Sequence, residues 1–257
     1  MKTKSIKCNF KNSRGHTLDA RLDVPESFDR GKTGRFIIFC HCFTCSKETI
    51  TTYRLSRLLA EQGYAVLRFD FTGLGSSEGD FSASNFSTTQ DDLRCAIAYL
   101  ENHYGPVCFL MGHSMGGTTA LSVARDYANI RGVVTIASPS EPEHVLHHFD
   151  HSLTLLEQNI TASFEVAGQY FDIEPGFVED VRSFNMQSCL SKLDKPVLVF
   201  NIENDKLVDE TNAKEIQQWV KGEVDLITVK NADHLLSNRL SSKGVAQKII
   251  EWLNNKK

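Results

Sequence analysis

One serine in the sequence stands in a setting that could make it a nucleophile. Ser114 is the central residue of Gly112-His113-Ser114-Met115-Gly116, a Gly-x-Ser-x-Gly pattern. An apolar run at 107–111 precedes the pattern, and residues with helical periodicity follow it. A tight turn between a buried strand and a helix, with glycines on both sides, holds a serine hydroxyl exposed and in strained geometry. The sequence therefore predicts that Ser114 attacks a carbonyl carbon.

A serine hydroxyl needs a base to take its proton, and that base must be a histidine close to it in space. The chain has nine histidines, but only His234 lies beyond residue 151. In the chain order serine, acid, histidine, the base follows the last strand of the sheet. His234 lies in a polar segment directly after the alternating run at 224–229, so it is predicted to be the base.

The acid that orients the imidazole should follow the preceding strand, which is predicted at 197–202. Three acids are available there: Glu203, Asp205 and Asp209. Glu203 still belongs to the edge of the strand, and Asp209 is typical of a helix N-cap. Asp205 stands three residues past the strand end, where it can turn into the loop. We therefore predict Asp205 as the third member of a triad.

Negative charge that develops on the carbonyl oxygen requires two backbone N–H donors. One belongs to the residue after the nucleophile, Met115. The second should lie in the loop after the early strand at 36–40, and Phe43 is the best candidate by position. The alternative for Phe43 is an aromatic core residue that only closes the loop.

The elements that must position these groups alternate along the chain. Apolar runs of strand length occur at 36–40, 64–69, 107–111, 132–137 and 197–202. Helix-period segments occur at 47–62, 85–103, 115–128, 209–220 and 240–254. This order predicts an α/β fold with a mostly parallel sheet and helices on both faces. An N-terminal hairpin comes first, with Leu18, Ala20, Leu22 and Val24 on its buried face, and a loop at 30–34 follows.

The alternation is interrupted at about 139–190, where no buried strand is visible and the pattern is helical. We interpret this segment as a lid inserted into a single domain that spans 1–257. Its histidines have the spacing of one helical face and are predicted to donate hydrogen bonds toward the cleft, with a metal cluster as the alternative: His144, His147, His148 and His151. Its aromatic residues either line an apolar pocket or pack the lid: Phe149, Phe164, Tyr170, Phe171 and Phe177.

Composition and charge set the class of protein. The 257 residues are 41% hydrophobic and 23% charged, and 28 Lys+Arg against 32 Asp+Glu give a formal net charge of −4. The basic residues are mixed with acids, so no nucleic-acid partner is expected. The apolar runs are far below the roughly 20 residues of a membrane helix, and no signal-peptide core is visible. We expect a cytoplasmic protein, monomeric or homodimeric, with no membrane partner.

Seven cysteines, an odd number in a chain large enough to fold without cross-links, favour reduced thiols. Cys42 and Cys45 have the Cys-x-x-Cys spacing that also occurs in zinc sites and redox pairs. A structural zinc site usually needs a second such pair, which the sequence lacks. Buried thiols are our main interpretation, and redox control of the oxyanion loop is the alternative.

Together these motifs resemble the α/β-hydrolase superfamily over nearly the whole chain. The resemblance includes the Gly-rich segment at 68–77 and implies an eight-stranded, mostly parallel sheet with a helical lid after the sixth strand. Segments 41–47, 69–79 and 142–147 are similar to the hydrolase half of bacterial proteins fused to an OsmC-type peroxide-reducing domain, and we expect this chain to lack that second domain. The layout and lid length are also similar to those of small feruloyl and cinnamoyl esterases.

Two positions depart from the pattern of that superfamily. Cys42 stands where glycine is common in the oxyanion loop, and Ile202 stands where glycine commonly begins the acid loop. Neither change removes a reacting group. The resemblance and the residues together predict that Ser114, His234 and Asp205 hydrolyse a small carboxylic ester without cofactor or metal. A serine peptidase acting on short peptides and a non-catalytic ligand-binding homologue are the alternatives.

Overall fold

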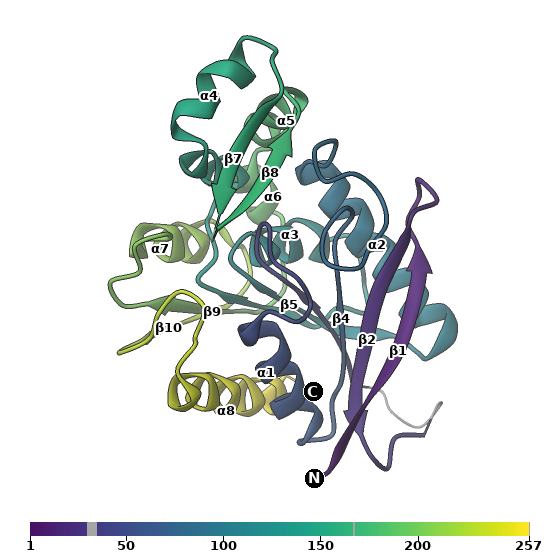
Figure 1. The fold of residues 1–257 in the computed structure, drawn as a ribbon. Coiled ribbons are helices and arrows are strands. Elements are labelled where there is room, and N and C mark those ends of the chain that lie inside the picture. The colour runs from purple at the N-terminus through teal and green to yellow at the C-terminus, as the bar shows by residue number, and fades with distance from the viewer. Residues whose placement is uncertain (30–34, 167, 257) are drawn as a thin grey trace.

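The computed structural model describes residues 1–29, 35–166 and 168–256, so the loop predicted at 30–34 lies outside the described residues (Figure 1). A mixed sheet of eight strands lies at the centre, in the order β1-β2-β4-β3-β5-β6-β9-β10. The strands are β1 (Thr3–Lys11), β2 (Thr17–Pro25), β3 (Phe36–Cys40), β4 (Ala65–Phe69), β5 (Val107–His113), β6 (Gly132–Ile136), β9 (Val197–Ile202) and β10 (Val224–Val229). β1 is antiparallel to β2 and β2 to β4, whereas β3, β4, β5, β6, β9 and β10 run parallel. The predicted mostly parallel sheet is confirmed.

Helices cover both faces of this sheet. On one face lie α1 (Ile50–Ala60) and α8 (Arg239–Asn255), and on the other lie α2 (Phe86–His103), α3 (Met115–Ala124) and α7 (Glu210–Trp219) (Figure 1). β3 is apolar without interruption because its alternate side chains enter two different cores. Phe36 and Ile38 pack on the α2 and α3 side, and Ile37 and Phe39 pack on the α1 and α8 side. No helix in the described part of the chain is both long enough and apolar enough to cross a membrane.

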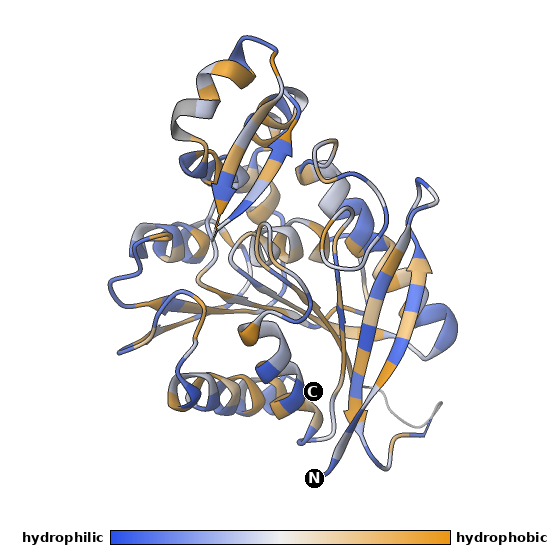
Figure 2. Ribbon diagram, in the orientation of Figure 1, coloured by the Kyte–Doolittle hydropathy of each residue, from blue (hydrophilic) through white to orange (hydrophobic). Residues whose placement is uncertain are grey.

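The first two strands form the predicted hairpin. Leu18, Ala20, Leu22 and Val24 are each fully buried, and Asp19 and Arg21 between them are partly exposed. Asp23, on the same face as Asp19 and Arg21, is buried in an ion pair with Arg68 of β4. Figure 2 shows this alternation as orange and blue bands along β2. Gly15, with φ of +84°, supplies the left-handed residue in the turn.

The segment between β6 and β9, which we call the insertion, lies at the top of the view (Figure 1), and its buried apolar residues share one core with the α2 and α3 side of the sheet. It contains η1 (Pro142–His148), α4 (Asp150–Glu157), β7 (Ala162–Val166), β8 (Gln169–Ile173), α5 (Gly176–Ser183) and α6 (Met186–Leu190). The expectation of a purely helical segment was incomplete, because β7 and β8 pair as an antiparallel hairpin. Each of these strands has only five residues, too few for alternation to be distinguished from helical periodicity.

The order of the strands indicates where a site can form. β3 lies between β4 and β5 in the sheet. The chain therefore adds β4 on one side of β3 and then crosses over to add β5 on the other side. The loops that follow β3 and β5 therefore separate at the carboxyl edge of the sheet, and ligands of parallel α/β sheets bind at such a switch point. These two loops carry Phe43 and Ser114.

Candidate active site

Ser114 lies in the turn between β5 and α3, with φ of 52° and ψ of −130°. This backbone conformation is uncommon for a residue with a side chain and is held by a 2.8 Å hydrogen bond from the Ser114 N–H to the Ile136 carbonyl oxygen of β6. The turn requires its two glycines: a Cβ on Gly112 would lie 2.2 Å from backbone atoms of Gly116, and a Cβ on Gly116 would lie 2.4 Å from two carbonyl oxygens at the end of β3. The predicted strand–turn–helix setting of Ser114 is present.

His234 and Asp205 come together from two different loops. His234 Nδ1 lies 2.7 Å from Asp205 Oδ2, and the side chains are 12% and 1% exposed. Asp205 Oδ1 accepts from the backbone N–H groups of Leu207 (2.9 Å) and Val208 (3.3 Å). The carboxylate is therefore fixed on both oxygens and presents one of them to the imidazole.

The other two acids of this loop have different surroundings. Glu203 is exposed, and its carboxylate lies 3.9 Å from Lys230 Nζ. Asp209 is the N-cap of α7 and accepts from the Thr211 N–H at 2.8 Å, as its predicted capping role requires. Of the three candidates that the sequence offered, the structure places Asp205 against His234.

The environment of Asp205 keeps it ionised. Burial alone raises the pKa of this carboxyl, but the hydrogen bond and charge of His234, together with the Leu207 and Val208 amides, bring the pKa below its ordinary value. A carboxylate that stays charged can orient the Nδ1–H tautomer of the imidazole and stabilise an imidazolium.

His113 is a positioning residue that the sequence analysis did not assign. It is fully buried, and its Nε2 lies 2.7 Å from the backbone carbonyl oxygen of His234. A carbonyl only accepts, so the proton is on Nε2, and Nδ1 is buried without a hydrogen-bond partner among the described residues. Burial, followed by the nearby His234, lowers the pKa of His113 to about 3. A polar residue at the end of an otherwise apolar strand was the available signal.

The two predicted oxyanion donors lie on facing elements. Met115 is the first residue of α3, where backbone N–H groups have no partner within the helix and the helix dipole favours negative charge. Phe43 lies in the loop between β3 and α1, next to Thr44, which has a left-handed backbone with φ of 57°. Both residues line the same pocket, so the loop after β3 meets the start of α3 there.

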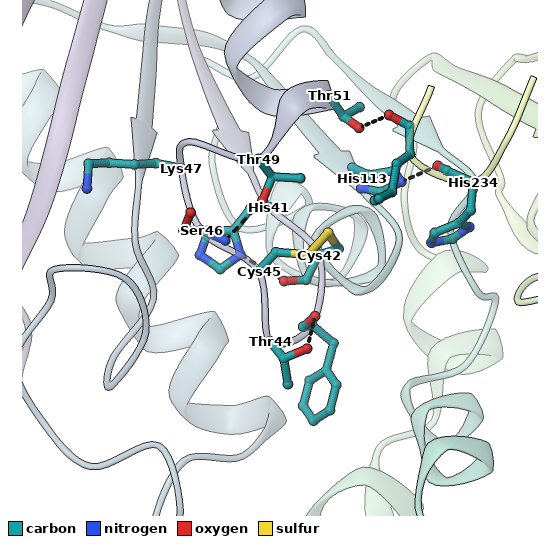
Figure 3. The surroundings of a disulfide bond; sticks show 12 residues. His41, Cys42, Thr44, Cys45, Ser46, Lys47, Thr49, Thr51, His113 and His234 are labelled. Carbon is teal, nitrogen blue, oxygen red and sulfur yellow. Dashed lines mark hydrogen bonds between the residues drawn. A yellow bond between two sulfur atoms is a disulfide. The ribbon is translucent and has the colours of Figure 1, made fainter. Parts of the chain in front are cut away.

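The structure corrects the interpretation of Cys42 and Cys45 as reduced thiols. They form a disulfide in the loop after β3, with Cα atoms 5.2 Å apart (Figure 3). The physical reason is the turn, because the Cys45 N–H donates to the Cys42 carbonyl oxygen at 3.2 Å and so brings the two side chains into bonding range. The other five cysteines remain thiols, as expected: Cys8, Cys40, Cys95, Cys108 and Cys189.

An apolar pocket adjoins the oxyanion residues. Its walls include Phe71, Leu74 and Phe81 from the sheet side and Phe177 from the insertion. The Phe43 ring contacts a set of aromatic rings at centroid distances of 5.5 to 6.1 Å: Phe81, Phe149, Phe164 and Phe177. Phe171 joins the set through Phe81 and Phe164, whereas Tyr170 is 76% exposed. The aromatic residues therefore pack the insertion onto the site, Tyr170 excepted.

The histidines of the insertion do not share one helical face. His144, His147 and His148 lie in the 3-10 helix η1, which has three residues per turn, and the side chain of His151 lies outside those described. His144 Nε2 lies 2.7 Å from the Leu207 carbonyl oxygen, next to the Asp205 loop, and the His148 ring stacks on Phe43 at 6.4 Å. Within the described residues no group of histidine, cysteine and acidic side chains has the geometry of a metal site.

Comparison with known proteins gives one family and several similar structures. A family model described as "Serine aminopeptidase, S33" (Hydrolase_4) matches residues 32–171. The esterase domain of a Rhodothermus marinus protein is 34% identical, with 98% of each chain covered and a TM-score of 0.76. Est1E from Butyrivibrio proteoclasticus, solved with ferulic acid, is 20% identical, with 96% of this chain and 99% of that chain covered and a TM-score of 0.80. The mitochondrial palmitoyl-protein thioesterase ABHD10 of Mus musculus is 22% identical over 82% of this chain and 72% of its own length.

Proposed function

We propose that this chain, which belongs to the Hydrolase_4 family of α/β hydrolases and has their fold, is a serine esterase that cleaves carboxylic esters through an acyl-enzyme on Ser114. The 2.7 Å contact between His234 and Asp205, in loops that meet the Ser114 turn through His113, carries this proposal. The similar esterase domain and Est1E, solved with ferulic acid bound, support a carboxylic ester as the substrate class.

Each residue has a defined role in the proposed reaction. His234 Nε2 takes the proton of the Ser114 hydroxyl as the serine oxygen attacks the ester carbonyl carbon, and Asp205 stabilises the imidazolium. The Met115 and Phe43 N–H groups donate to the tetrahedral oxyanion. His234 then gives the proton to the leaving alcohol. Water repeats the cycle on the acyl-enzyme and releases the acid.

The apolar pocket beside Met115 and Phe43 is the proposed acyl site. It is closed on one side by Phe177 of the insertion, so we assign residues 139–190 of the single domain as a lid that limits acyl size. Phenylalanine walls favour an apolar acyl group because they offer few hydrogen-bond partners to a polar one.

The direct test is hydrolysis of p-nitrophenyl esters from acetyl to decanoyl, with methyl ferulate and an alanine anilide beside them. We expect ester turnover with a preferred acyl length, and a loss of at least about 10³-fold in Ser114→Ala. Faster cleavage of the anilide than of the esters would favour the peptidase that the family description names. No turnover of any substrate by the wild type would favour a non-catalytic binding protein.

A further inference from the structure

The disulfide between Cys42 and Cys45 encloses the residue whose backbone is proposed to bind the oxyanion. Phe43 and Thr44 lie within a four-residue turn that is closed both by the cross-link and by the hydrogen bond from the Cys45 N–H to the Cys42 carbonyl oxygen. Figure 3 shows this cross-linked turn between β3 and the start of α1. The direction of the Phe43 N–H is therefore restrained by the disulfide.

Both ends of this loop are fixed independently of the disulfide. The Phe71 N–H donates to His41 Nε2 (3.2 Å), so the His41 proton is on Nδ1, which donates to the Cys42 carbonyl oxygen (2.8 Å). On the other side, the backbone N–H of Lys47 donates to Asp70 Oδ1 (2.6 Å), and Lys47 Nζ forms a buried ion pair with Asp70 Oδ2. Breaking the disulfide therefore leaves the ends of the loop in place and loosens only residues 43–45.

The two sulfur atoms differ in their access to solvent. Cys42 is 5% exposed and lines the acyl pocket, whereas Cys45 is half-buried and does not line that pocket. The neighbouring Cys40 thiol is fully buried in the core, and burial raises its pKa, so it does not compete in exchange. An external thiolate therefore has one favourable target, the sulfur of Cys45.

The same loop leads into a helix that contacts the loop of His234. The Thr51 hydroxyl donates to the Leu235 carbonyl oxygen, and Arg54 donates to the Ser237 carbonyl oxygen at 2.5 Å, both from α1. A change in the conformation of the turn can therefore affect both the Phe43 N–H and, through α1, the loop that carries His234. The effect is expected to be larger at Phe43, which is inside the turn, than at His234.

We propose that Cys42 and Cys45 form a redox-active pair, exchanged by an external dithiol, whose oxidised state orients the Phe43 N–H for catalysis. This inference rests on the proposed esterase function. A thiolate of the dithiol attacks Cys45 Sγ; the bond between the two protein sulfurs breaks, and its electron pair leaves on Cys42 Sγ, which takes a proton. The second thiol of the reagent then attacks the reagent sulfur of the mixed disulfide and expels Cys45 as a thiolate. The protein gains two electrons and two protons, and the dithiol becomes a disulfide.

The test compares the oxidised protein with protein that has been reduced by dithiothreitol, desalted without oxygen and assayed at once. Thiols are counted by alkylation and intact mass, and kcat and KM are measured on p-nitrophenyl acetate. We expect two new alkylated thiols and a fall in kcat of about tenfold with KM within about twofold, since complete loss of an oxyanion donor costs about 10² to 10³ in kcat. Reoxidation should restore kcat.

Two variants separate the pair from general thiol effects. Cys42→Ser with Cys45→Ser should have the kcat of the reduced protein and should not respond to dithiothreitol, whereas Cys95→Ser, a partly exposed thiol on α2, should behave as the wild type. Unchanged thiol counts, or two new thiols with kcat within twofold, would overturn the redox inference alone. No turnover in either redox state would instead contradict the esterase function and, with it, the proposal that the redox state of Cys42 and Cys45 controls catalysis.

Discussion

Acidification should destabilise the folded chain through His113. This imidazole is fully buried, donates from Nε2 to the His234 backbone and has no partner for Nδ1 among the described residues. A proton on Nδ1 would place a charge in the core beside His234, which is why burial lowers the pKa of His113 to about 3. In the unfolded chain the imidazole is exposed to water, and its pKa is about 6.5.

The direction and the size of this change in the free energy of unfolding follow from proton linkage. Between the two pKa values the unfolded state binds a proton that the folded state does not, so stability falls as the pH drops below about 6.5 toward 3. For pKa values of about 6.5 and 3, the contribution of His113 to the loss between pH 8 and pH 5 is about 2 kcal/mol. At pH 8 both states are neutral at this position, and His113 contributes no pH dependence.

Urea unfolding at pH 8 and pH 5, on the wild type and on His113→Gln, measures this contribution. Glutamine keeps an N–H donor for the His234 carbonyl oxygen but cannot take the extra proton. His41, which is also buried with a lowered pKa, is present in both proteins and cancels in the comparison. We expect the wild type to lose about 2 kcal/mol more than the variant between the two pH values. Equal losses would refute the assignment of His113 as a buried neutral imidazole.

Three further predictions test the site. Asp205→Asn should lower kcat by about 10³ to 10⁴ because the imidazole loses its orienting carboxylate, while Glu203→Gln should stay within about twofold; steady-state kinetics on one ester decide this. Gly116→Ala should lower Tm and abolish turnover, since its Cβ would lie 2.4 Å from backbone oxygens, whereas Gly244→Ala, which meets nothing within 4 Å, should keep activity and raise stability by about 0.5 to 1 kcal/mol. Phe177→Leu should shift the preferred p-nitrophenyl ester to a longer acyl chain, and an unchanged preference would remove Phe177 from the acyl wall.

The regular part of the fold was predictable because each of its elements carries its own periodicity. The strands at 36–40 and 197–202 have the predicted bounds, since both faces are buried and every residue except Asn201 is apolar. The Ser114 turn was predictable for a steric reason. Only glycine fits at positions 112 and 116, because a Cβ there would lie 2.2 to 2.4 Å from backbone atoms. Asp205 was preferred over its neighbours by loop position, and the structure places it against His234.

The remaining features depend on contacts between distant segments or on local turns that spacing does not specify. Cys-x-x-Cys is compatible with thiols, metal sites and disulfides, and the turn that closes between Cys42 and Cys45 selects the last. The hairpin of β7 and β8 is too short to show its period. The role of His113 depends on a carbonyl 121 residues further along the chain, to which no sequence pattern points.

The most direct measurement of the central claim is the site of labelling by a fluorophosphonate probe. Intact mass and peptide mapping should show one adduct per chain, on Ser114, and His234→Ala should slow its formation by at least about 100-fold because the serine loses its base. Stoichiometric labelling of Ser114 that depends on His234 is the result we predict. No adduct, or an adduct on another residue with Ser114 unmodified, would contradict the assignment of Ser114 as an activated nucleophile.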